Sequence, residues 1–140
     1  MAILFEHTQI NGLELPNRFI RSATWEELAD KNGDCTPELV KLMAKLARGQ
    51  VGLIITGHSY VHPAGQATPR QLGVDNDGRI TGLRALTAAV HTEGGRIIMQ
   101  LAHGGLGADS QLTGTELLGP STGEGLAKSP GREMKTNDIH

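Results

Sequence analysis

The sequence predicts an α/β fold in which parallel strands alternate with helices. Two apolar runs, residues 51–61 and 96–102, are typical of strands buried on both faces of a parallel sheet. A segment with helical periodicity precedes each of them, which predicts βαβ units with right-handed crossovers. A hairpin signal opens the chain. This order fits a doubly wound sheet or a barrel, and the hairpin suits a cap over the bottom of a barrel.

The hairpin is predicted by apolar and polar residues that alternate on both sides of Asn11-Gly12. This dipeptide is a strong signal for a two-residue turn. We expect strands at Thr8–Ile10 and Leu13–Leu15, ended by Pro16. A further short strand then begins at Phe19 and reaches Arg21.

Both helices carry recognisable end signals. Thr36 is the expected N-cap of the first helix, Pro37 takes its first position and Gly49 stops it. The second helix ends at the glycine pair 94–95. The expected buried residues are Leu39, Leu42, Met43 and Leu46 in the first helix, and Ile80, Leu83, Leu86, Ala89 and Val90 in the second.

The strand at 96–102 is followed by about thirty residues that we predict to form a loop, and loops of this length are usually functional or disordered. Residues 136–138 then look like a helix start. Three strands cannot close a barrel, which takes eight strands and typically about 250 residues. We therefore expect residues 1–140 to be the N-terminal portion of a single, larger barrel domain, or a half-barrel that needs a partner.

Composition argues against several classes of protein. Thirteen basic residues balance fifteen acidic ones, which leaves no polybasic surface for nucleic acid. No apolar run is long enough to span a membrane, and the N-terminus lacks the features of a signal peptide. The single cysteine, Cys35, cannot form an intramolecular disulfide, and we interpret it as a solvent-facing or half-buried thiol. These features favour a cytoplasmic protein.

Three segments in order, "NRFIRSAT", "GQVGLIITGHSYVHPAG" and "IIMQLAHGG", resemble the N-terminal portion of the Old Yellow Enzyme family. This family comprises FMN-dependent NADH:flavin oxidoreductases, including 2,4-dienoyl-CoA reductase and related ene-reductases. The resemblance implies a TIM (β/α)8 barrel that binds FMN. It also implies that NADH or NADPH delivers a hydride, through FMN, to an activated alkene or related small-molecule acceptor.

The resemblance also implies cofactor contacts. Residues after the first barrel strand pass beside the flavin ring in the family, and here these are Ser22, Ala23, Thr24 and Trp25. The end of the second strand falls at Gly57 and His58, and the glutamine of the third strand is Gln100. The glutamine has an independent physical rationale. Its amide offers one donor and one acceptor, which match two groups on the polar edge of a flavin.

Substrate contacts are expected from Trp25 and His103. Trp25 stands where relatives often carry Cys, Thr or His, and an indole there would stack near the ring or narrow the pocket. His103 lies beyond the third strand or points away from Gln100. Leu106 replaces the arginine that usually follows, and His58 replaces a typically small residue. The family's catalytic groups are expected beyond His140, so no catalytic residue is assigned.

Two rival functions stay open. His58 and His103, at the tops of adjacent strands, could ligate a metal in a barrel hydrolase, although carboxylates are missing nearby and we predict that neither binds one. His62 is interpreted as a surface or internally satisfied histidine. The chain could instead be an inactive fragment or a half-barrel binding module. Alone, it would self-associate or require the remainder of the barrel to cover its open strand edges.

Overall fold

The computed structural model describes residues 3–125 and 129–138. The helices are α1 (Pro37–Arg48), α2 (Ile80–Thr92) and α3 (Ser110–Thr113). The strands are β1 (Thr8–Ile10), β2 (Leu13–Leu15), β3 (Ile20–Arg21), β4 (Leu53–Tyr60), β5 (Ile97–Ala102), β6 (Leu117–Gly119), β7 (Gly123–Glu124) and β8 (Pro130–Glu133). Short 3₁₀ turns cover Ile3–Phe5, Pro63–Gly65, Asp77–Arg79, Gly105–Gly107 and Thr136–Asp138.

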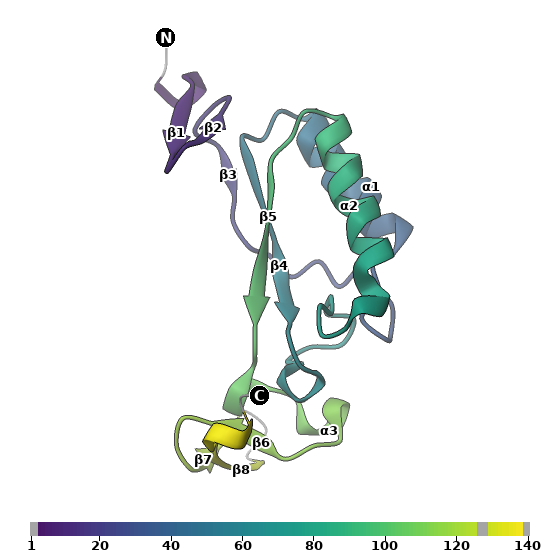
Figure 1. Cartoon of the computed structure of the whole chain (residues 1–140), viewed down its shortest axis with the longest axis vertical. Helices are drawn as coiled ribbons and strands as arrows, with labels where there is room; N and C mark the ends of the chain where they lie inside the picture. Colours follow the sequence, from purple (N-terminus) through teal and green to yellow (C-terminus); the bar gives the residue numbers. More distant parts are fainter. Residues whose placement is uncertain (1–2, 126–128, 139–140) are drawn as a thin grey trace.

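The central sheet has the strand order β3-β4-β5, and both pairs are parallel, as the sequence predicted. Helices α1 and α2 lie together on one side of this sheet (Figure 1). The hydrophobic core fills the space between these helices and the sheet, with Met43, Ile54, Leu86 and Val90 at its centre. The opposite face of the sheet carries no covering layer in the described part of the chain, and Ile98 on that face is 45% exposed.

The N-terminal hairpin forms in the predicted register, with Thr8 opposite Leu15 and Ile10 opposite Leu13. Asn11 and Gly12 have φ values of 44° and 87°, the left-handed conformations that a two-residue hairpin turn of this type requires. The hairpin lies at the end of the sheet where β4 and β5 begin (Figure 1). A cap over the bottom of a barrel would occupy this position.

The helix bounds agree with the predicted end signals, but the buried stripes differ in part. In α1, Ala47 is buried in place of Leu42, which lies outside the core cluster. In α2, Leu86 and Val90 are buried as expected, whereas Ile80 is 47% exposed. A helix advances about 100° per residue, so Ile80 lies about 90° from the centre of the stripe formed by Leu83, Leu86 and Val90. The expectation that Ile80 faces the core was wrong for that reason.

Thr36 gives a test of the α1 N-terminus. Its hydroxyl accepts a hydrogen bond from the Leu39 N–H and donates one to the Leu28 carbonyl oxygen. Thr36→Ala should therefore lower the free energy of unfolding by about 1 kcal/mol, the usual loss on removing an N-cap. Urea unfolding measures it. The control is Thr92→Ala, at the C-terminal end of α2, which should change stability far less.

The predicted loop after β5 is in fact structured. It contains α3 and a second sheet of order β6-β8-β7, which lies beyond the carboxyl ends of β4 and β5 (Figure 1). Leu106 packs so tightly against Gly119 and Gly131 that a Cβ at either glycine would overlap its side chain. The glycines that suggested irregular chain make room for this leucine. A 3₁₀ turn stands where a helix start was expected, and residues 139–140 lie outside the described part.

Candidate cofactor site

An irregularity in β4 decides which side chains share a face of the sheet. Ile55 pairs with Ile98, but the next pair is His58 with Gln100, so β4 carries one extra residue. In a regular ladder His58 would pair with Leu101 and face the helices. The Thr56 hydroxyl fills the irregularity: it accepts the Gln100 N–H at 3.1 Å and donates to the Gly57 carbonyl at 2.9 Å. The bulge therefore aligns His58 beside Gln100.

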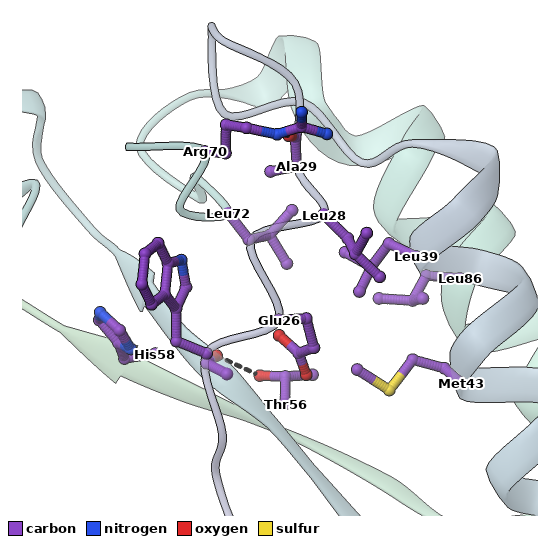
Figure 2. A pocket seen from close by; sticks show the side chains of 12 residues that line it. Glu26, Leu28, Ala29, Leu39, Met43, Thr56, His58, Arg70, Leu72 and Leu86 are labelled. Atoms are coloured by element: carbon purple, nitrogen blue, oxygen red, sulfur yellow. Dashed lines mark hydrogen bonds between the residues drawn. The ribbon is translucent and has the colours of Figure 1, made fainter. Parts of the chain in front are cut away.

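Gln100 and His58 lie on the open face, near the carboxyl ends of their strands. Ile97 and Met99 pack against the helix-side core, so Gln100 points to the opposite face by alternation. Figure 2 shows His58 directed away from Leu39, Met43 and Leu86. Gln100 is exposed, and its amide has no hydrogen-bond partner within residues 3–125 and 129–138. Both a donor and an acceptor are thus free to meet a ligand.

The segment Ser22–Trp25 continues β3 as extended chain. The Thr24 hydroxyl donates to the Ser22 carbonyl oxygen, and the Trp25 side chain is 38% exposed. The backbone N–H groups of residues 23–25 have no backbone partner in the described structure. Gly57 lets this segment run close to β4, since a Cβ there would lie 2.8 Å from the Thr24 carbonyl oxygen. Gly57 therefore supports the segment rather than forming part of the open face.

An ion pair not anticipated from the sequence lies beneath this segment. Arg21 Nη2 is 2.7 Å from Glu26 Oε1, and the two residues flank Ser22–Trp25 in the chain. Arg21 also donates to the Ile55 carbonyl oxygen of β4. The two opposite charges that bracket the predicted cofactor segment are visible in the sequence, but whether they meet depends on how the chain turns after β3.

The enclosed cavity behind the segment cannot hold a cofactor. Leu28, Leu39, Met43 and Leu86 line it, and its volume of about 10 Å³ leaves room for no more than one water molecule (Figure 2). A ring system as large as a flavin would not fit in this cavity.

A larger pocket of about 610 Å³ lies beyond the strand ends, where the second sheet begins. It is lined by Val61, His62, His103, Leu118, Met134, Asn137 and Asp138. The His62 and His103 rings stack with centroids 6.4 Å apart. His103 follows the last residue of β5, which explains its offset from Gln100.

Both imidazoles in this pocket are tied to the backbone through the same atom. Gly105 N–H donates to Nδ1 of His103 at 3.1 Å, and Ala64 N–H donates to Nδ1 of His62 at 3.2 Å. Because an accepting nitrogen carries no hydrogen, each neutral ring bears its proton on Nε2. His62 was expected to be a surface or internally satisfied histidine. It is exposed and its Nδ1 accepts a hydrogen bond, yet the residue also lines the pocket.

His103 predicts a pH dependence of stability. Partial desolvation of the His103 ring in the pocket, and secondarily the neighbouring His62, hold the pKa of His103 below its ordinary value near 6.5. As pH falls, the unfolded chain takes up this proton first, so stability is intact above pH 6.5 and is lost as pH falls through the lowered pKa. Urea midpoints between pH 7.5 and 5.5 should fall less steeply in His103→Gln. A slope equal to that of the parent chain would contradict this, and His7→Gln, which changes a histidine outside this pocket, is the control.

The remaining candidates for chemistry are less favourable. Burial raises the pKa of the half-buried Cys35 thiol to about 11, which leaves it almost entirely protonated at neutral pH and unsuited to nucleophilic attack.

The two histidines considered as metal ligands have different neighbours: His58 lies beside Gln100, whereas His103 stacks on His62. The described residues hold no cluster of three or more His, Cys, Asp or Glu arranged for a metal ion. In the same residues, no helix is long and apolar enough to cross a membrane.

Similar proteins were found both by sequence and by structure. A 4,4'-dithiodibutanoate disulfide reductase from Rhodococcus erythropolis is 34% identical over 119 residues, which cover 85% of this chain and 29% of that protein. A metal reductase from Desulforamulus reducens is 38% identical, covering 86% and 18%. An NADPH dehydrogenase from Bacillus subtilis is 37% identical, covering 76% and 32%. The chain thus spans less than a third of each of these relatives.

The structure of the Old Yellow Enzyme homologue from Zymomonas mobilis superimposes with a TM-score of 0.86 at 23% identity, covering 97% of this chain and 41% of that one. A 2-naphthoyl-CoA reductase complex gives a TM-score of 0.90 at 24% identity, covering 98% and 23%. The fold is therefore the N-terminal part of a TIM barrel, with β3, β4 and β5 as its first three strands.

The sequence profile of one FMN-binding family matches residues 3–140 of the chain. This match covers all three segments on which the resemblance was based, together with the chain beyond them. The chain belongs to the NADH:flavin oxidoreductase / NADH oxidase family.

Proposed function

We propose that this chain forms the first part of the flavin site of an FMN-dependent oxidoreductase of the ene-reductase type. The observation that carries the proposal is the free amide of Gln100 on the open face, level with His58 and near the extended segment Ser22–Trp25. Ligand sites in these barrels form at the carboxyl ends of the strands, where these residues lie.

The residues fit FMN on chemical grounds. When bound, FMN supplies the hydride chemistry between NADH or NADPH and an activated alkene or related acceptor. Gln100 would bind the ring's polar edge, with its amide N–H and C=O facing an acceptor and a donor. The free N–H groups of Ala23, Thr24 and Trp25 would add donors beside the ring. His58 would face the ring next to Gln100, and Gly57 would hold the segment close.

Substrate binding is proposed for Trp25 and His103. Trp25 ends the cofactor segment with its indole partly exposed, which suits a ring that narrows the approach to the flavin. His103 lines the 610 Å³ pocket together with apolar side chains such as Val61 and Leu118. An organic molecule with an oxygen acceptor would suit this lining, because the Nε2–H of a neutral histidine is a donor.

The acceptor is less constrained than the cofactor. The relatives carry names that refer to a disulfide, to metals and to fumarate, whereas a nicotinamide reductant recurs in several names. The residues described here would bind and tune the flavin.

We also propose a cytoplasmic location, which is supported by the single cysteine.

The absorbance spectrum of the purified protein tests the proposal directly. In a protein that carries the remaining strands of the barrel, the expected result is a visible flavin band that co-purifies, or that is retained after FMN is added and excess removed. Residues 1–140 alone should bind FMN weakly or not at all. A complete barrel that is folded by circular dichroism and retains no flavin would contradict cofactor binding by these residues. It would favour the alternative of an inactive fragment or half-barrel module.

A further inference from the structure

We propose that Arg21 and Glu26 act as positioning residues, whose ion pair clamps Ser22–Trp25 in the shape that contacts FMN. The inference rests on the proposed function for its consequence, whereas the clamp itself can be tested without any cofactor. Neither residue is assigned a contact with the ring.

The pair closes a short loop of chain. Arg21 Nη2 and Glu26 Oε1 are 2.7 Å apart, and the side chains are only 16% and 11% exposed. The four residues between them are the segment Ser22–Trp25. Since the pair is largely shielded from water, it is much less screened than a surface ion pair. Holding both ends together restricts the conformations open to the residues between.

Arg21 also fixes the loop to the neighbouring strand. Its guanidinium donates to the Ile55 carbonyl oxygen at 2.9 Å and to the Thr24 carbonyl oxygen at 3.3 Å. The first contact reaches β4 just before the bulge that aligns His58 with Gln100. One planar, multidonor side chain thus links the strand end, the segment and the bulge.

Glu26 is held from the other side by the same bulge. A Cβ at Gly57 would lie 2.5 Å from Glu26 Oε2, so the carboxylate packs directly against the β4 backbone. Its other oxygen, Oε1, is buried and has no aligned hydrogen bond in the described structure, so Arg21 is its compensating charge. Removing Arg21 would strand a buried carboxylate, which is costly.

The chain provides a matched control. Arg48 and Glu93 form an ion pair with a similar N–O distance, 2.6 Å. It joins the end of α1 to the residue after α2. The Arg48 side chain is 69% exposed, and the pair lies outside the candidate site. Surface pairs of this kind contribute little to stability. Its loss should leave Ser22–Trp25 unchanged.

Fluorescence of Trp25, the chain's single tryptophan, tests the clamp in the cofactor-free protein. Because Trp25 lies inside the clamped segment, its quenching by acrylamide should rise at least about twofold in Glu26→Gln and Arg21→Met, while the amides of α1 and α2 keep their hydrogen-exchange rates. Arg48→Met and Glu93→Gln should change neither measurement. Arg21→Lys, which keeps the charge without the fork of donors, should fall between. Unchanged quenching of Trp25 in all three clamp variants would overturn the proposal.

FMN titration then tests the positioning role. If the parent protein binds FMN, Glu26→Gln should bind it at least about tenfold more weakly and shift the bound flavin's visible spectrum, because the segment no longer meets the ring. Parental affinity and spectrum despite stronger quenching of Trp25 would show that the clamp does not position the cofactor. A parent protein that carries the whole barrel and binds no FMN would refute the proposed function, and the quenching result would still decide the clamp.

Discussion

In a protein that carries the complete barrel, replacing Gln100 with leucine should weaken FMN binding by about ten- to a hundredfold and shift the reduction potential of the bound flavin, without unfolding the protein. The amide would be the partner of the ring's polar edge, and an unpaired buried polar group costs about 1–3 kcal/mol. The fold should survive because Gln100 is exposed and only its backbone N–H contacts Thr56. Titration with FMN and potentiometry measure the two effects.

The control for Gln100→Leu is Gln111→Leu. Gln111 is also exposed, but it lies in α3, away from the central sheet. This variant should retain parental FMN affinity and potential. If Gln100→Leu also retains both, Gln100 does not contact the flavin, and the proposed orientation of the ring on the open face fails with it.

The elements that the sequence predicted are those with strong local signals. The hairpin is specified by Asn11-Gly12, and α1 by Thr36, Pro37 and its apolar period. Strands β4 and β5 are long apolar runs, so their composition alone identifies them. Burial on both faces holds for β4 only, because no residue of β5 is fully buried in the described structure. The small sheet β6–β8 was missed because its strands have two to four residues, too few for a period. Leu106, distant in sequence, supplies the apolar contact that these strands lack locally.

The site was predicted less completely than the fold. Gln100 could be placed at the open end of its strand from sequence alone, but the face on which His58 lies depends on the bulge. Gly57 inside an apolar strand is a known signal for a bulge, so the sequence does hold a clue to the position of His58. Arg21 and Glu26 could not be paired from sequence, because their contact depends on how the chain turns after β3.

In isolation, these 140 residues should associate into dimers or larger species. In the described structure β3 and β5 are the outer strands of the central sheet, so each leaves one edge without a partner strand. Open strand edges pair readily with other chains. Large apolar side chains accompany them: Phe19 is 40%, Ile20 45%, Ile98 45% and Leu101 65% exposed. Sedimentation equilibrium measures the outcome.

A single charge at the β5 edge should reverse much of this association. Leu101→Lys removes the most exposed of these apolar side chains and places a cation on an edge strand, a substitution that discourages edge-to-edge pairing. Leu112→Lys is the control, because Leu112 is 40% exposed in α3, outside the sheet. If the parent chain is instead a monomer with one cooperative melt, the open edges of β3 and β5 do not drive association. Leu101→Lys should then leave the sedimentation of the chain unchanged.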